Sequence, residues 1–219
     1  MIVAIDIETI PNTAMIPFLP PPKISKTLKD PAKIEAARIE GKQEQIDKMA
    51  LDALTARICT FALVGADKDY VSTIEQITDT AETILIESIM NTIGAEDVRL
   101  VTWNGIGFDL PMIYKRAMIL GVDPAQFGAP PLSAWTKRYN TDKHYDLMQI
   151  WGGWSSGSFA KLDTVAQMIL KDKKDDIDVT AIAGMIATPE GRDMVSQYCL
   201  QDTRLTWRLF EKFSGFLFV

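Results

Sequence analysis

The first nine residues constrain the fold more than any other stretch of the chain. Branched apolar residues there predict a buried β-strand, yet two carboxylates, Asp6 and Glu8, interrupt it. Side chains alternate along a strand, so Ala4, Asp6 and Glu8 share one face, and Val3, Ile5 and Ile7 share the other. Neighbouring acids on such a strand repel each other and lose hydration, which a multivalent cation would offset. The alternative is that both acids are solvated at a strand end.

Composition narrows the classes of protein that fit. The 219 residues can bury one core, so we expect one domain over residues 1–219. The chain has no apolar run as long as a membrane span and no basic-then-apolar leader, so we expect a cytoplasmic protein without membrane contact. The net charge of −6 argues against a general nucleic-acid coat, but not against an enzyme with a cation-loaded site. Cys59 and Cys199 lack metal-ligand spacing and are expected to be reduced, buried thiols.

The remaining patterns predict an α/β fold, a mixed five-stranded sheet flanked by helices. After the first strand, residues 13–57 form an insertion with a proline-rich basic loop and a helix from Asp30 to about Arg57, which Gly41 could interrupt. Further strands are expected at 58–64, 70–73, 98–103 and 145–150, and helices at 79–93, 111–121, 159–170 and from 188 to near the C-terminus. Asp79 and Glu82 are expected to open the second helix, and residues 171–178 to form a charged surface turn.

Two further acids stand where a cation site could form. Asp109 begins the helix after the fourth strand, where a carboxylate can stay ionised, although a helix cap is the other interpretation. Asp202 lies four residues after Tyr198 on an apolar face of the last helix that also carries Met194 and Leu205. An aspartate there needs a partner, either an arginine or lysine or a metal ion. Four carboxylates suit two-metal phosphodiester hydrolysis with Mg²⁺ or Mn²⁺.

Three segments in this order resemble the motifs of DEDD-type 3'→5' exonucleases. They are Ile5-Asp6-Ile7-Glu8-Thr9, Trp103-Asn104-Gly105-Ile106-Gly107-Phe108-Asp109-Leu110-Pro111 and Tyr198-Cys199-Leu200-Gln201-Asp202. The form of the second motif is most similar to the proofreading domain of family B DNA polymerases and its stand-alone relatives. The tyrosine of the third motif marks the DEDDy subtype. His144, the only histidine, is far upstream and is expected in a surface loop.

The resemblance implies a ribonuclease H-like fold and a role for each matching residue. Asp6, Glu8, Asp109 and Asp202 would hold two divalent cations, Mg²⁺ or Mn²⁺. Asp6 would bind both, Glu8 and Asp202 would complete the water-activating site, and Asp109 would hold the second ion. Tyr198 would orient the attacking water. Asn104 and Phe108 would touch the substrate strand near its 3' end, and the backbone of Thr9 would contact the terminal nucleotide.

The implied activity is release of nucleoside monophosphates from the 3' end of single-stranded nucleic acid, with DNA favoured. RNA 3'-end trimming and a non-catalytic end-binding or polymerase accessory module are the alternatives. No polymerase domain follows the third motif, so we expect a separate enzyme or a subunit, with a polymerase or another replication protein as a candidate partner.

Several other residues near the expected site have two interpretations. Asp146 and Asp163 are expected to be structural, because the set of four acids is already complete. Lys115, Arg116, Lys137, Arg138 and Lys143 are candidate phosphate contacts, and Trp135 and Tyr139 are candidates for stacking on single strands. A solvated basic loop explains the same residues.

Overall fold

One mixed sheet organises the computed structural model, which describes residues 1–172 and 177–217. The strands are β1 (Ile2–Pro11), β2 (Ala56–Val64), β3 (Asp69–Thr73), β4 (Arg99–Thr102) and β5 (His144–Asp146), in the order β3-β2-β1-β4-β5. β2 is antiparallel to both β1 and β3, whereas β4 is parallel to both β1 and β5. The sheet confirms the predicted ribonuclease H-like arrangement. Four of the eight residues predicted as a charged turn, 173–176, lie outside the described ranges.

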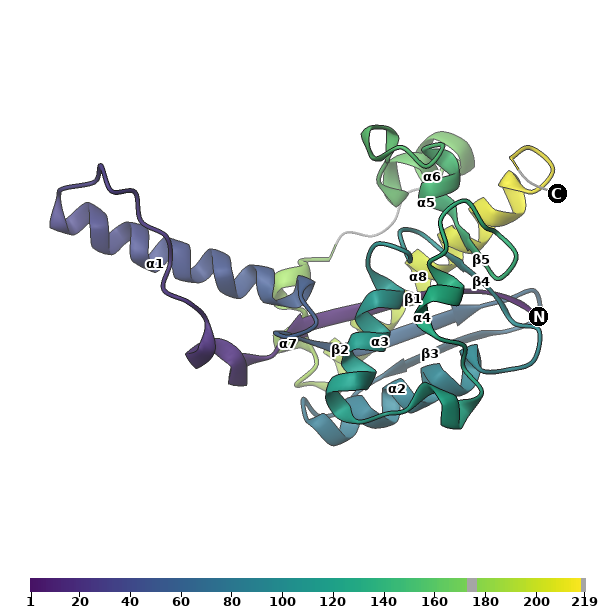
Figure 1. The fold of residues 1–219 in the computed structure, drawn as a ribbon, viewed down its shortest axis with the longest axis horizontal. Coiled ribbons are helices and arrows are strands. Elements are labelled where there is room, and N and C mark those ends of the chain that lie inside the picture. The colour runs from purple at the N-terminus through teal and green to yellow at the C-terminus, as the bar shows by residue number, and fades with distance from the viewer. Residues whose placement is uncertain (173–176, 218–219) are drawn as a thin grey trace.

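Helices cover both faces of the sheet (Figure 1). α2 (Asp79–Ile93) and α3 (Asp109–Leu120) pack on one face, and the long α8 (Pro189–Phe213) packs on the other. The remaining helices are α1 (Pro31–Lys48), α4 (Leu132–Trp135), α5 (Leu147–Trp151), α6 (Leu162–Leu170) and α7 (Ile182–Met185). Within the described residues, no helix is both long and apolar enough to cross a lipid bilayer.

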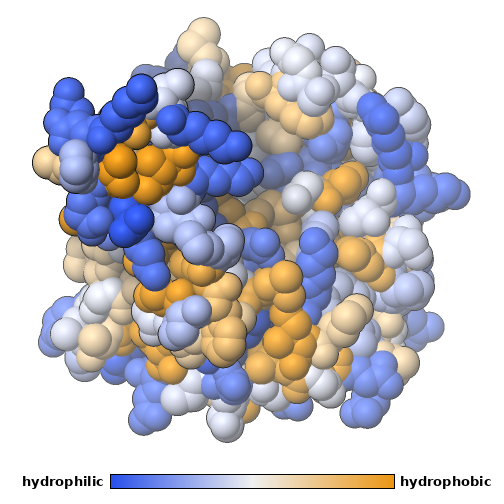
Figure 2. Space-filling view, turned by 60° about the vertical axis from the view of Figure 1, so that its left-hand side comes forward, coloured by the Kyte–Doolittle hydropathy of each residue, from blue (hydrophilic) through white to orange (hydrophobic). Residues whose placement is uncertain are grey.

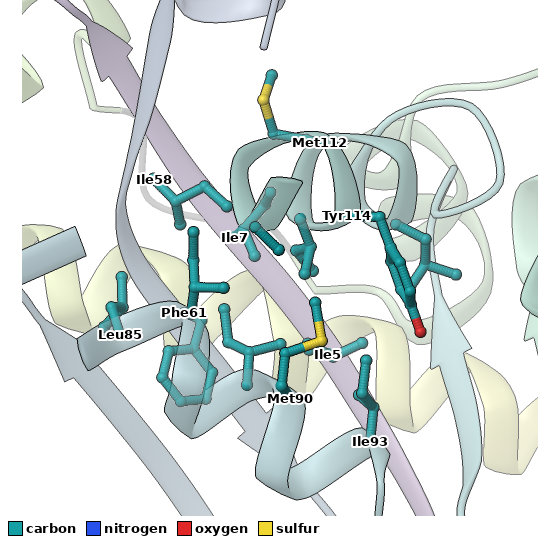
Figure 3. Packing of buried hydrophobic residues seen from close by; sticks show 14 of the residues in the cluster. Ile5, Ile7, Ile58, Phe61, Leu85, Met90, Ile93, Met112 and Tyr114 are labelled. Carbon is teal, nitrogen blue, oxygen red and sulfur yellow. The ribbon is translucent and has the colours of Figure 1, made fainter. Parts of the chain in front are cut away.

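The alternation of β1 divides the interior into two cores. Val3, Ile5 and Ile7 pack with α2 and α3, and Figure 3 shows Ile5 and Ile7 among apolar side chains of those helices and of β2. Ala4 belongs to the second core, beneath α8. Because Asp6 and Glu8 share the face of Ala4, the predicted separation of an apolar face from an acidic face holds.

The helix ends show which local signals the chain uses. Thr78, not Asp79, caps α2 by accepting the Ala81 N–H at 3.2 Å. The Glu82 side chain does not complete a capping box with Asp79, because it points inward and binds two arginines. Thr188 caps α8 by accepting the Gly191 N–H, and the helix begins where the sequence predicted.

Residues 13–55, called the arm below, project from the end of β1 next to Glu8 (Figure 1). Its two ends are joined by a hydrogen bond from the Asn12 N–H to the Thr55 carbonyl at 2.7 Å. The helix of the arm ends at Lys48 rather than near Arg57, because Met49 is buried and the chain turns there, with the Thr55 hydroxyl donating to the Met49 carbonyl at 2.9 Å.

Gly41 does not interrupt α1. A Cβ added at Gly41 would lie 2.8 Å from Cβ of Pro22, so the outgoing chain of the arm packs closely against the helix at this glycine. The arm is therefore a helix with an extended segment laid against it.

The predicted strand over 145–150 is wrong beyond Asp146. The Asp146 carboxylate accepts the N–H groups of Met148 and Gln149 at 3.1 and 3.2 Å and so starts α5, which the apolar run 147–150 alone did not reveal. His144 is not a surface residue either. It is buried in β5, and its ring bonds to Thr102 Oγ1 and to the Trp135 carbonyl, both at 2.8 Å.

Candidate active site

Asp6 and Glu8 lie on the face of β1 that α8 covers, and both are partly exposed. One ligand atom from each of Asp6, Glu8 and Cys199 lies within 4.8 Å of the other two. The Cys199 thiol points at Asp6, with its sulfur 3.7 Å from the backbone oxygen and 3.8 Å from Oδ2. Helix α8 therefore reaches the two acids of β1 through Cys199.

Asp109 contacts the same strand from α3, which packs on the face of the sheet opposite α8. It is the first residue of α3, and its buried carboxyl is hydrogen-bonded by the backbone of Ile7, the residue between Asp6 and Glu8. The β1–β4 pairing ends at Ala4, so this part of β1 is left open for a side-chain partner. Burial, and to a smaller extent the charge of Asp146, raise the pKa of Asp109 to about 7 against the lowering effect of backbone hydrogen bonds.

The loop between β4 and α3 is held by Asp146. Its carboxylate accepts the N–H groups of Asn104 at 3.2 Å and Ile106 at 2.9 Å, in addition to the two at the start of α5. Asn104 has a φ of 74°, and a Cβ at Gly105 would lie 2.3 Å from Thr102 Oγ1, so the turn needs a small residue there. The structural role predicted for Asp146 agrees with these four bonds.

Asp202 enters from α8 and is 8% exposed. Burial raises the pKa of the neighbouring Cys199 thiol well above its ordinary value, and the charges of Asp6, Glu8 and Asp202 raise it further. The charges of all three carboxylates therefore act on one thiol. Together with Asp109 against Ile7, all four acids named from the sequence lie around the middle of β1.

The face of α8 that carries Asp202 is not the one predicted in every detail. Leu205 is buried with Asp202, as expected, but Met194 is 58% exposed. Tyr198 is half-buried and lines a cavity of about 500 Å³ together with Gln197, Gln201 and Arg204. The tyrosine therefore stands between the buried acids and an open surface of the helix.

The predicted substrate contacts Thr9, Asn104 and Phe108 lie at the edge of this site. The Thr9 hydroxyl donates to the Ala50 carbonyl at 2.8 Å, so its side chain fastens the arm and only its backbone is left for another partner. Phe108 lines a cavity of about 280 Å³ with Leu51 of the arm and Lys115 of α3.

Two of the candidate nucleic-acid contacts are wrong. Trp135 is 1% exposed and donates its indole N–H to the Tyr114 hydroxyl at 2.8 Å, so it cannot stack on a base. Arg116 is buried against Glu82. Arg138 donates to the Trp154 carbonyl at 2.7 Å and lies over the ring of Tyr139, but both side chains are exposed and stay candidates for a strand contact.

Cys199 is the site residue that sequence reasoning missed. Its place three residues before Asp202 puts both on one side of a helix, which was the available signal. A raised pKa keeps the thiol protonated beside the acids, so the donors left for a cation are carboxylate oxygens. Such a donor set fits hard divalent ions such as Mg²⁺ and Mn²⁺.

The chain is similar to known proteins over most of its length. Residues 50–217 match a family model described as "Predicted 3'-5' exonuclease related to the exonuclease domain of PolB". The DNA polymerase of Thermococcus aggregans is 26% identical over 183 residues, 79% of this chain and 10% of that protein. The DNA polymerase catalytic subunit of Human herpesvirus 6A is 32% identical over 95 residues, 42% of this chain and 9% of that protein. The chain thus spans about a tenth of the length of these relatives.

A solved structure shares the fold. The family B DNA polymerase from the archaeon Pyrobaculum calidifontis superposes with a TM-score of 0.58 at 19% identity, covering 97% of this chain and 24% of that one.

Proposed function

Because the chain belongs to the family of predicted 3'-5' exonucleases related to the exonuclease domain of PolB, we propose that it removes nucleoside monophosphates from the 3' end of single-stranded nucleic acid. We propose DNA as the substrate, since the relatives named above are DNA polymerases. A polymerase or another replication protein is the partner that this proposal suggests.

The observation that carries the proposal is the meeting of four acids from three elements around the middle of β1. Asp6 and Glu8 come from β1, Asp109 from the start of α3 and Asp202 from α8. We propose that they hold two divalent cations, Mg²⁺ or Mn²⁺, with Asp6 shared by both, Glu8 and Asp202 at the first and Asp109 at the second. Ions so bound would lower the pKa of a water molecule and offset charge on the phosphate.

The chain's own residues would do the positioning. Tyr198, half-buried and four residues before Asp202, would orient the attacking water through its hydroxyl. Asn104 and Phe108, on the loop held by Asp146, would contact the nucleotides nearest the 3' end, and the backbone of Thr9 would contact the last one. The rigid hold of Asp146 on that loop supports a fixed substrate position.

The test follows shortening of a 5'-labelled single strand with Mg²⁺ or with Mn²⁺, using matched DNA and RNA. The proposal expects a ladder of products that lose one nucleotide at a time, faster for DNA, and no ladder from Asp6→Ala. Tyr198→Phe should lower kcat and leave the unfolding midpoint unchanged. Equal trimming by Asp6→Ala would reject the site, and faster trimming of RNA would reject the DNA preference. Cation-dependent thermal stabilisation without any turnover would favour a non-catalytic end-binding module.

A further inference from the structure

The arm has a composition and a position that the catalytic machinery does not use. Its residues 13–55 carry seven lysines and arginines against six acids, whereas the whole chain has a net charge of −6. The basic residues gather in the outer half, where residues 20–42 hold six of them against three acids. The arm is thus a basic projection on an otherwise acidic protein.

These basic side chains are available to a partner. Lys23, Lys26, Lys29 and Lys33 are exposed, and within the described residues none of them forms an ion pair. Two of the three acids in this stretch are engaged, since Asp30 caps α1 by accepting the Ala32 N–H at 2.9 Å and Glu35 pairs with Arg38 at 3.3 Å. The local positive charge is therefore not neutralised by the protein itself.

The arm also lacks a core of its own. Every residue of α1 is at least partly exposed, and Phe18 and Ile39 are 76% and 65% exposed. In Figure 2, where this side of the molecule comes forward, hydrophobic side chains in the foreground are ringed by hydrophilic ones. Exposed basic groups beside exposed apolar ones suit a strand that carries both phosphates and bases.

The arm begins where the acids end. Thr9, the residue after Glu8, and Asn12, the first residue after β1, are both hydrogen-bonded to the base of the arm. Eighteen helical residues reach about 27 Å, so the outer lysines stand several nucleotides from the acids if phosphates are spaced by about 3.4 Å or more. Figure 1 shows α1 running back to the sheet from the far end of the arm, with its start at Pro31 farthest out.

We propose that the arm binds the phosphates of a single-stranded nucleic acid upstream of the 3' end that lies in the active site. The inference rests on the proposed exonuclease function for the direction of the strand. Charge attracts the polyanion to the arm, and the fixed base of the arm sets the path from the outer lysines to the acids. The arm thereby favours long strands over short ones.

Binding in EDTA tests this inference without any turnover. Fluorescence anisotropy would follow the full chain with labelled single-stranded DNA of about 20 or about four nucleotides, over a range of salt concentrations. The arm variant is Lys23→Gln/Lys26→Gln/Lys29→Gln. The matched control is Lys68→Gln/Arg99→Gln/Lys212→Gln, which removes the same charge from exposed positions outside the arm. Arg99 and the turn that carries Lys68 lie at the opposite end of β1 from the acids.

The arm variant should bind the long strand about tenfold more weakly than the wild type and lower the salt slope by about two, since each lost phosphate contact removes about 0.7. The control variant and the short strand should change far less. Equal loss in the two variants, or no loss in the arm variant, would overturn the inference. Cleavage plays no part in this measurement, so the two proposals can fail separately. If the protein shortens strands but the arm variant binds them as tightly as the wild type, only the role of the arm is rejected. If the arm variant binds more weakly but the wild type does not cleave, only the catalytic proposal is rejected.

Discussion

Glu82 and Asp109 are two buried carboxylates in this molecule, and their surroundings differ in kind. Glu82 is 0% exposed and is bound through both oxygens by Arg116 at 2.6 and 2.7 Å, by Arg57 at 3.3 Å and by the Ile58 N–H at 2.9 Å. Asp109 is bound by the backbone of Ile7 and faces the charge of Asp146. The first acid joins α2, α3 and β2, whereas the second is set beside another carboxylate.

The difference teaches how to separate a structural acid from a functional one. A buried acid that the fold needs is given its counter-charge by the protein, while a buried acid kept near other acids gains from a cation supplied from outside. Burial alone does not distinguish the two.

The largest expected effect is on activity at Asp109. Asp109→Asn should lower kcat by roughly 10³-fold with single-stranded DNA, because a neutral amide is a poor ligand for a divalent ion, while folding is retained. Steady-state kinetics with labelled strands would measure it. An Asp109→Asn protein with kcat within tenfold of wild type would remove Asp109 from the set of catalytic acids.

Glu82 should act on stability. Glu82→Gln should lower the free energy of unfolding by about 3–5 kcal/mol, because it leaves the buried guanidinium of Arg116 without its counter-charge and leaves Arg57 with Asp79 alone. Urea titration measures the change, and Glu87→Gln, on the exposed side of the same helix, is the control. If both variants shift the midpoint equally, the buried network is not what holds α2 to α3.

The raised pKa of Asp109 should make the free energy of unfolding depend on pH. Its folded pKa of about 7 lies above the ordinary value of 3.8, so between these values the folded protein holds a proton that the unfolded chain has released. Stability of the cation-free protein should therefore fall as pH rises from about 4 to about 7, by on the order of 4 kcal/mol, and level off above. Asp109→Asn should be flatter over this window in thermal unfolding with EDTA, and parallel curves would contradict the assignment.

A smaller effect on stability is expected at Asp146, which holds the loop between β4 and α3. Asp146→Asn should cost about 2 kcal/mol, because an amide offers one acceptor oxygen where two carboxylate oxygens now serve four N–H groups. It should also lower the pKa of Asp109 by removing a nearby charge. Chemical denaturation measures the first effect against Asp67→Asn, an exposed control, and an unchanged midpoint would mean that the loop holds itself.

The smallest effect is expected at Cys199. Because its thiol stays protonated, Cys199→Ala should leave kcat with Mg²⁺ within about threefold of wild type and should cost about 1–2 kcal/mol of packing. A loss comparable to that of Asp109→Asn would make the thiol a ligand or a proton donor.

Much of the molecule could be predicted from local pattern. The alternation of β1 separates acids from apolar residues without reference to the rest of the chain, and the spacing of Tyr198 and Asp202 places them on one face of α8. Tertiary contacts decide what local pattern left open. Asp146 bonds to the distant loop at Asn104 and Ile106, and His144 and Trp135 are buried by bonds to residues distant in sequence. Cys199 gains its place only because α8 crosses β1 at Asp6.

The central claim is that the four acids form one site for two divalent ions. Calorimetric titration with Mn²⁺ tests it most directly, with the wild type compared with Asp6→Ala and Asp202→Ala. The account predicts two bound ions per wild-type chain and a loss of binding in both variants, more severe for Asp6→Ala because Asp6 is shared. Two ions bound with unchanged affinity by Asp202→Ala would contradict it, since α8 would then lie beside the acids of β1 without joining their site.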